Sequence, residues 1–164
     1  MQYVEINTTI LGKGICEALI QTEKENEMGE IYREEKTDTT AINYSVPISD
    51  ELIEDILCSA FEGGITYWAN NVSCHNRKDG KKVGGWKHEY LTKTKLKDAK
   101  LIVHTIEGGQ VAFSKKSIID ALQKMDTPEY KYTKALKRLL FGGWDAWDSD
   151  IVVQTACFGE VVYG

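Results

Sequence analysis

The amino-acid sequence predicts an α+β fold: a single compact domain in which a mixed or antiparallel sheet is packed by three to five helices. Its 164 residues match the usual size of one domain, and 42% of them are hydrophobic. Apolar residues recur at helical spacing in several segments, which alternate irregularly with β-branched stretches. Residues 100–113 indicate a β-hairpin, which favours α+β over a regular βαβ repeat.

The N-terminal part of the chain predicts four elements. They are a strand over residues 1–10, a short helix over 12–24, a polar loop or hairpin over 23–39 and a strand over 40–48. Pro47 favours the end of that last strand or an edge of the sheet. We expect residues 1–40 to form a variable strand and helix appendage, and residues 41–164 to form the α+β core domain.

The clearest helix is predicted over residues 49–62. Ser49 is a suitable N-cap, and the carboxylates of Asp50 and Glu51 fall in the first turn, where the helix dipole favours negative charge. A glycine pair, Gly63 and Gly64, then ends the helix. Its apolar face is expected to pack on the sheet and consists of Leu52, Ile53, Ile56, Leu57, Ala60 and Phe61.

The rest of the chain predicts a long loop, the hairpin and three further helices. Residues 65–69 are compatible with a strand or with a continued helix, whereas residues 70–86 are polar, glycine-rich and basic, which is typical of a long loop. Ser114 is expected to cap the first of these helices, Pro128 to lie in the first turn of the second, and Gly142–Gly143 to end the second. The third helix is expected to begin with Asp148 as its cap and to end at Gly159, and a final strand is expected over 160–163.

Charge and hydropathy argue against two classes of partner. The formal net charge of -5 disfavours binding to duplex DNA, although residues 77–100 hold nine basic and only three acidic residues. No stretch of about 18 apolar residues and no secretory signal occur, so we expect no membrane association and a cytoplasmic location. The four cysteines show no CxxC pairing and are expected to be free thiols.

No signature of a catalytic class occurs: GxSxG, HExxH and the P-loop pattern are all missing. A zinc site from Cys74, His75 and His88 would lack a fourth ligand, so no metal and no cofactor is predicted. A Cys74–His88 nucleophile pair is conceivable, but nothing in the sequence sets its geometry. His104 is expected to be an ordinary sheet histidine. Whether the protein is an enzyme stays open, and a non-catalytic role is favoured.

The richest candidate site is the segment of residues 67–90, where aromatic side chains alternate with asparagine, histidine and basic residues. Aromatic faces stack on nucleobases, and arginine or lysine binds phosphates. The alternative is that the aromatic residues belong to the core and the lysines to a solvated surface. The predicted ligand-binding residues are Tyr67, Trp68, Asn70, Arg77, Lys82, Trp86, His88 and Tyr90; the second candidate is the Trp144–Trp147 segment.

Two segments carry a resemblance to a family. Residues 60–69 (AFEGGITYWA) and 149–164 (SDIVVQTACFGEVVYG) resemble a family of small, uncharacterised tailed-phage and prophage proteins. That family combines a helix ending in GGIxYW, a middle part with Leu-Thr and a hairpin, and a C-terminal DxxVQxxxFGExVYG. The middle part corresponds here to Tyr90-Leu91-Thr92 and to the predicted hairpin, so the resemblance covers roughly residues 45–164.

The resemblance implies a phage protein that acts in the cytoplasm of a bacterial host cell. The leading expectation is a counter-defence protein that binds and sequesters a small anionic nucleotide immune signal without catalysis. The runner-up is a protein–protein inhibitor of a host defence or transcription factor, and the third reading is a nucleotide-degrading enzyme. The expected partner is therefore a small nucleotide-like anion or a host protein, and assembly into a homo-oligomer is possible.

Overall fold

The computed structural model describes residues 2–8, 42–76, 79–83, 87–93, 99–127 and 129–164. The helix expected over 12–24 and the loop expected over 23–39 lie outside these ranges. Two strands, β1 (Gln2–Thr8) and β2 (Ile42–Ile48), form a two-stranded sheet where strands were predicted. Spatial clustering divides the chain into one unit of Met1–Val4 with Val46–Gly164 and a second unit of Glu5–Ser45. The larger unit is described below.

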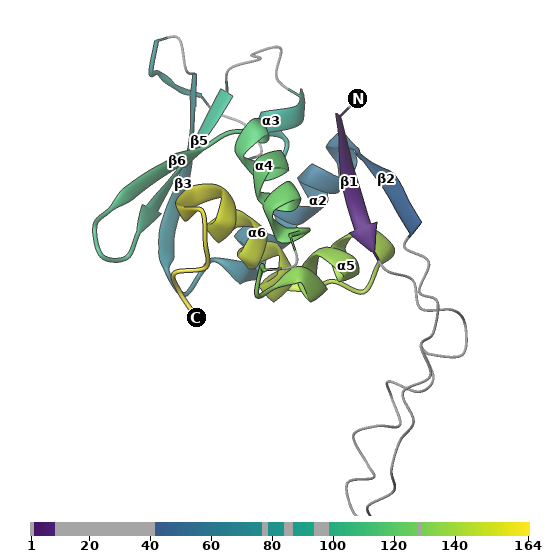
Figure 1. Cartoon of the computed structure of the whole chain (residues 1–164). Coiled ribbons are helices and arrows are strands. Elements are labelled where there is room, and N and C mark those ends of the chain that lie inside the picture. Colours follow the sequence, from purple (N-terminus) through teal and green to yellow (C-terminus); the bar gives the residue numbers. More distant parts are fainter. Residues whose placement is uncertain (1, 9–41, 77–78, 84–86, 94–98, 128) are drawn as a thin grey trace, which may run out of the picture. The chain divides into compact units, whose positions relative to one another are not determined.

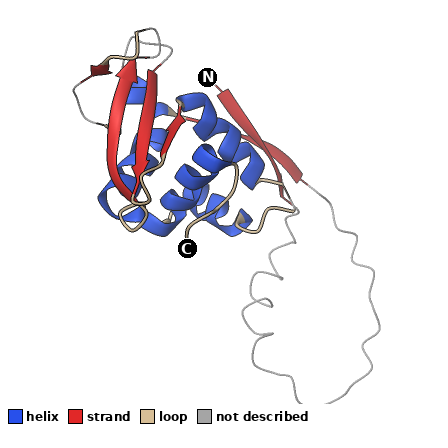
Figure 2. Ribbon diagram, turned by 90° about the vertical axis from the view of Figure 1, so that its left-hand side faces the viewer, coloured by secondary structure: helices blue, strands red, loops and turns tan. Residues whose placement is uncertain are grey.

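The predicted α+β class is confirmed, and its main sheet is antiparallel. Strands β3 (Ala69–Asn76), β5 (Ala99–Thr105) and β6 (Gln110–Phe113) form the sheet, and the two-residue strand β4 (Lys82–Val83) extends it beside β3. The strands β5 and β6 are the predicted hairpin. Figure 1 and Figure 2 both show the helices behind one face of this sheet, and among the described residues no helix covers the other face.

The covered face of the sheet is apolar, as its residue alternation requires. Along β5 every second side chain is buried, beginning at Ala99 and ending at Thr105. Val72 and Cys74 of β3 and Phe113 of β6 are buried as well. In an antiparallel pair, directly opposite residues project to the same face. The remaining positions of these strands therefore form one outward-facing surface.

Strand β3 corrects the expectation of a long loop over residues 70–86. The segment reads ANNVSCHN, and its composition suggests a loop because asparagine is rare in strands. Only Val72 and Cys74 supply the inward, apolar alternation, and pairing with β5 supplies the rest. Residues 65–68 form a turn before the strand begins.

The predicted helix after Ser49 is α2 (Asp50–Ser59), and its helical path continues as a π-helical turn, η1 (Ala60–Gly64). The hydroxyl of Ser49 caps it by accepting from the backbone N–H of Leu52, as expected. Its buried residues include Ile53, Ile56 and Leu57. The expectation that this face packs on the sheet is wrong: α2 packs chiefly on helices α6 (Ala146–Phe158) and α3 (Tyr90–Lys93), because α6 lies between α2 and the strands.

Helices α4 (Lys115–Met125) and α5 (Thr133–Phe141) follow the hairpin. Ser114 caps α4 through a capping box, as predicted. The expectation for Pro128 is wrong because α5 begins five residues later, after two turn-forming tyrosines. Gly142 and Gly143 end α5 with φ of +89° each, which is a conformation that glycine adopts without steric cost.

Helix α6 is the central element of the unit and contacts η1, α2, α4, α5 and β6. Its N-cap is Asp145, three residues before the predicted Asp148, which instead completes the capping box. Gly159 ends the helix with φ of +82°, as expected. The predicted final strand over 160–163 is wrong: this C-terminal tail has no strand partner and is bound by side chains.

Candidate functional site

The GGIxYW segment and the C-terminal segment meet in one buried polar cluster. Trp68, fully buried immediately before the first residue of β3, donates its indole N–H to Oδ1 of Asp150 at 2.7 Å. The hydroxyl of Tyr67 lies 2.8 Å from the other oxygen, Oδ2. Asp150 is itself fully buried on α6, so these donors replace the water that its carboxyl group loses on folding.

Gln154 joins this cluster to the C-terminal tail. It stands one helical turn after Asp150, and its Nε2 lies 2.8 Å from Oδ2 of that carboxyl group. Its Oε1 accepts the backbone N–H groups of Val162 and Tyr163 at 2.8 and 2.7 Å. The ring of Tyr163 then stacks on Trp68 at a centroid distance of 5.2 Å and an interplanar angle of 2°. One glutamine side chain thus provides the hydrogen bonds that a strand partner would otherwise give the tail.

Burial dominates the electrostatics of this cluster. Desolvation raises the pKa of the Asp150 carboxyl group, although the hydrogen bonds from Trp68, Tyr67 and Gln154 act in the opposite direction. Desolvation and the nearby Asp150 likewise raise the pKa of the Tyr67 hydroxyl. Both changes disfavour proton release. The cluster therefore holds segments together and is poorly suited to acid–base chemistry.

The residues predicted to bind a ligand separate into two groups. Tyr67 and Trp68 belong to the buried cluster, and Trp68 is covered by Tyr163 and Phe158, which leaves no free face for a nucleobase. Asn70 is exposed near the same end, and its Nδ2 lies 3.5 Å from the carbonyl oxygen of Thr105.

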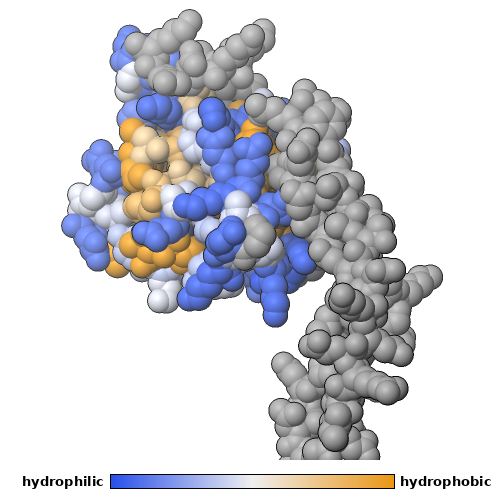
Figure 3. Space-filling view, viewed as in Figure 1, coloured by the Kyte–Doolittle hydropathy of each residue, from blue (hydrophilic) through white to orange (hydrophobic). Residues whose placement is uncertain are grey.

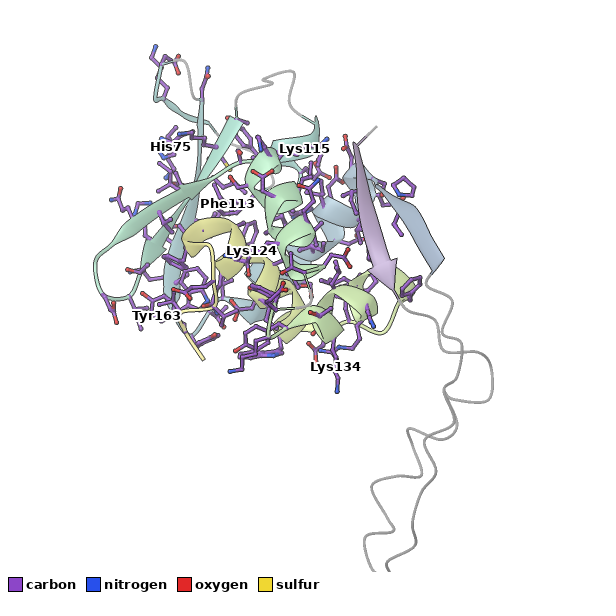
Figure 4. The ribbon with its side chains drawn as sticks, viewed as in Figure 1. His75, Phe113, Lys115, Lys124, Lys134 and Tyr163 are labelled. Atoms are coloured by element: carbon purple, nitrogen blue, oxygen red, sulfur yellow. The ribbon has the colours of Figure 1, made fainter. Side chains whose placement is uncertain are left out.

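The other predicted residues lie toward the far end of β3. Lys82 is exposed on β4 directly opposite His75. His88 is half-buried, and Tyr90 is buried at the start of α3. Strand geometry puts roughly 20 Å between Trp68 and His75, and Figure 4 shows His75 and Tyr163 near opposite ends of the sheet. Arg77 and Trp86 lie outside the described residues.

The outward face of the sheet carries basic side chains in one row. His75 of β3 stands opposite Lys82 of β4 on one side and opposite Lys100 of β5 on the other. The next row contains Ser73, Ile102 and Ala112, and the third contains Asn71, His104 and Gln110. Across these nine described positions there is no aspartate or glutamate. The face is therefore polar and positively charged at one end.

Three side chains within this face form a cluster that the sequence did not reveal. The hydroxyl oxygen of Ser73 lies 3.0 Å from Nε2 of His75 and 3.1 Å from Nε2 of His104. Nδ1 of His75 lies 3.0 Å from the carbonyl oxygen of Gly80 in the β3–β4 turn. The i, i+2 spacing of Ser73 and His75 would have indicated a shared face, had residues 70–76 been recognised as part of a strand. His104 could be placed beside them only through the strand register.

Exposed apolar side chains lie around the other end of the molecule. Tyr67 contacts the carbonyl of Tyr163, and Trp147 lies against the C-terminal Gly164. Val162 of the tail is 55% exposed. In Figure 3 apolar surface, coloured orange, spreads over the C-terminal part of α6 and the strands beside it. The side chain of Trp147, which the sequence named as part of the second candidate site, is 42% exposed.

The described cysteines offer little nucleophilic or metal-binding chemistry. Cys58, Cys74 and Cys157 are free thiols, whereas Cys16 lies outside the described residues. Burial raises the pKa of the Cys74 thiol, although Lys87 and Lys82 act in the opposite direction, so the reactive thiolate is disfavoured. Within the described ranges no three His, Cys, Asp or Glu side chains are grouped to hold a metal ion, and no helix is long and apolar enough to span a membrane.

Comparisons with protein-family models, with curated proteins and with solved structures find no significant match to this chain.

Proposed function

We propose that the protein binds a small, phosphate-bearing nucleotide on the outward face of its antiparallel sheet. The observation that carries the proposal is the row of Lys82, His75 and Lys100 on three adjacent strands. Neighbouring strands lie about 4.8 Å apart, so the row spans about 10 Å, which suits one or two phosphate groups. Lysine and histidine donate to phosphate oxygens, and strands β3, β4, β5 and β6 contain no carboxylate that would compete for them.

The rows beside the cations suit the rest of a nucleotide. Ile102 and Ala112 give a small apolar strip on which a base or ribose can lie. Asn71 and Gln110 flank His104 in the third row and supply amide groups for polar edges. The local excess of basic residues over 77–100 attracts an anion to this end of an otherwise acidic protein.

The counter-defence role is the broader part of the proposal. Tight binding alone removes a nucleotide signal from the cell, so sequestration needs no catalytic step. Its support is the resemblance of residues 60–69 and 149–164 to small phage proteins. Expression in bacteria whose immunity depends on a nucleotide signal tests it: wild-type protein should restore phage growth, and a variant that no longer binds nucleotides should not.

Binding is tested by calorimetry with cyclic di-AMP, ATP and the dinucleotide UpA. We expect Lys100→Ala and Lys82→Ala to weaken the affinity about 10-fold or more, because a hydrogen bond to a charged group contributes about 1.5–3 kcal/mol. Lys134→Ala is the matched control: this lysine is exposed on α5, and Figure 4 shows it far from His75. Heat denaturation of the complex should release the ligand. No binding of any probe, or equal losses in all three variants, would contradict the proposal.

A second candidate function is inhibition of a host protein. The exposed side chains of Tyr67, Trp147 and Val162 around the C-terminal tail favour it, since aromatic residues are enriched at protein interfaces. Trp147→Ala and Val162→Asp should then abolish phage protection in cells while nucleotide binding is retained. If restored phage growth depends on Lys100 and not on Trp147, the result would favour nucleotide binding over inhibition of a host protein.

A further inference from the structure

The hydrogen bonds around Ser73 define where the protons lie. A carbonyl oxygen can only accept, so the contact with Gly80 places a proton on Nδ1 of His75. In neutral His75, Nε2 then carries a free electron pair and accepts the hydroxyl proton of Ser73. Because a hydroxyl group has one proton, its oxygen must accept from Nε2–H of His104. In this arrangement Nε2 of His75 is a hydrogen-bond acceptor and Nε2 of His104 is a donor.

The two imidazoles converge on one small volume. Both Nε2 atoms lie within 3.1 Å of the same oxygen, so they are no more than about 6 Å apart. Both rings are half-buried on the outward face, whereas Ser73 beneath them is almost fully buried. A general base and a general acid must each come within hydrogen-bond reach of the proton they move. Both Nε2 atoms face the Ser73 hydroxyl, so the rings must turn away from Ser73 to reach a ligand on the outward face, where the two nitrogens are close enough to act on one phosphodiester group.

The same volume adjoins the cationic row. His75 is a member of both groups, and Lys82 and Lys100 stand on either side of it. Ammonium groups in this position stabilise the negative charge on the non-bridging oxygens of a phosphoryl group in the transition state. The sequence lacks a recognisable catalytic cluster because these residues come from two strands and a turn, separated by 31 positions between Ser73 and His104.

We propose that this site cleaves phosphodiester bonds that have a neighbouring ribose 2′-hydroxyl, without a metal ion; the inference rests on the nucleotide binding proposed above. Nε2 of His75 takes the proton of the 2′-hydroxyl, and the 2′-oxygen forms a bond to phosphorus. The bond from phosphorus to the 5′-oxygen breaks, and that oxygen takes a proton from Nε2 of His104 in its doubly protonated form, which leaves His104 neutral and His75 protonated. The products are a 2′,3′-cyclic phosphate and a 5′-hydroxyl, and no water or redox partner is consumed. Ser73 is a positioning residue that keeps the two rings oriented.

The test uses UpA and cyclic di-AMP with EDTA present, and the products are identified by chromatography and mass spectrometry. We expect a 2′,3′-cyclic phosphate from wild-type protein. His75→Gln and His104→Gln should lower the rate 100-fold or more, since general acid–base catalysis contributes 10²–10⁴-fold, while both variants still bind the probes. Lys134→Ala should leave the rate unchanged. The analogue of UpA with 2′-deoxyuridine should bind and remain intact.

Each of the other possible outcomes contradicts either the proposed cleavage or the proposed binding. Probes that bind tightly and stay intact would overturn the cleavage and leave the proposed binding function standing. Probes that neither bind nor react would overturn both. Cleavage that persists in the His75→Gln/His104→Gln double variant, or cleavage of the deoxy analogue, would show a contaminating nuclease or another mechanism, and would also refute the assignment. Ser73→Ala should lower the rate less than either histidine substitution, and an equal loss would identify Ser73 as a nucleophile instead.

Discussion

Asp150 is a carboxyl group that the protein surrounds with neutral donors. Indole, phenol and amide groups from Trp68, Tyr67 and Gln154 reach its two oxygens within 2.8 Å. A buried hydrogen-bond acceptor is tolerated only while its donors are present, because a buried polar group left without a hydrogen bond lowers the stability by about 1–3 kcal/mol. The side chain therefore stabilises the contact of α6 with β3 and the tail.

Asp150→Asn should lower the free energy of unfolding by about 1–3 kcal/mol at neutral pH, because the amide NH₂ meets donors where the carboxyl oxygen accepted them. The loss should also depend on pH. Burial raises the pKa of Asp150, so the folded state binds its proton more tightly than the unfolded state, and wild-type stability falls as pH rises from the ordinary aspartate range to the raised pKa. Urea unfolding at several pH values should show the wild-type advantage shrinking through that window. An advantage that grows with pH would show that the hydrogen bonds outweigh burial.

At the scale of elements, the glycine pair after α2 allows a close approach of helices. A Cβ atom built on Gly64 would overlap the carbonyl oxygen of Ala146 at the start of α6. On Gly63 it would lie 3.4 Å from the Cβ of Ala146, an ordinary contact. Both glycines belong to η1, and only the second faces the helix backbone directly. The pair therefore offers a matched comparison within one helical turn.

Gly64→Ala should lower the free energy of unfolding by about 1–3 kcal/mol, since an added methyl group in a packed interface forces backbone shifts. Gly63→Ala should change it by less than about 1 kcal/mol, and in the stabilising direction if the helical preference of alanine prevails. Urea denaturation with unchanged m-values measures both. Equal losses in the two variants would mean that flexibility of the turn, and not the approach to α6, requires glycine.

Whether an element could be predicted from the sequence depends on how close together in the chain the residues that specify it lie. Helices α2 and α4 and the β5–β6 hairpin were predictable because caps, apolar spacing and turn residues lie within a few positions of each other. Strand β3 was not, because its asparagines resemble a loop and only pairing with β5 makes it a strand. The strand expected after Gly159 was predicted from local signals that were misleading. Its β-branched residues suit a strand, but its backbone N–H groups bind the side chain of Gln154.

The residues of the candidate site could likewise be predicted only where the evidence for them is local in the sequence. Lys82 is exposed on β4, and its assignment as a phosphate ligand stays a prediction. Trp68 was misleading because an aromatic residue in a polar segment suggests a ligand, yet its partner Asp150 lies 82 positions away. Ser73 was not singled out and His104 was expected to be an ordinary sheet histidine, because their proximity depends on strand register, which one sequence does not specify.

At the scale of the whole molecule, structure and proposed function occupy different ends of β3. The Asp150 cluster and the apolar tail lie at its beginning, and the row of His75 with two lysines lies near its end, roughly 20 Å away. Substitutions separated by more than about 7–10 Å and sharing no partners usually act independently. Residues 60–69 and 149–164 therefore contribute to the stabilising core, and substitutions on the outward face should leave that core unchanged.

Substitutions at the two ends of β3 should affect stability and ligand affinity independently, which one experiment can test. Asp150→Asn should lower the melting temperature and leave the affinity for cyclic di-AMP within about twofold of wild type at temperatures where both proteins are folded, because no cluster residue contacts the cationic row. Lys100→Ala should weaken the affinity about 10-fold or more and leave the melting temperature within about 2 °C, since surface substitutions usually change stability by less than about 0.5 kcal/mol. The double variant should show both losses added together. A loss of affinity in Asp150→Asn at full folding would place the ligand against the Trp68 cluster, and a sharp drop in melting temperature for Lys100→Ala would make the outward face a structural surface.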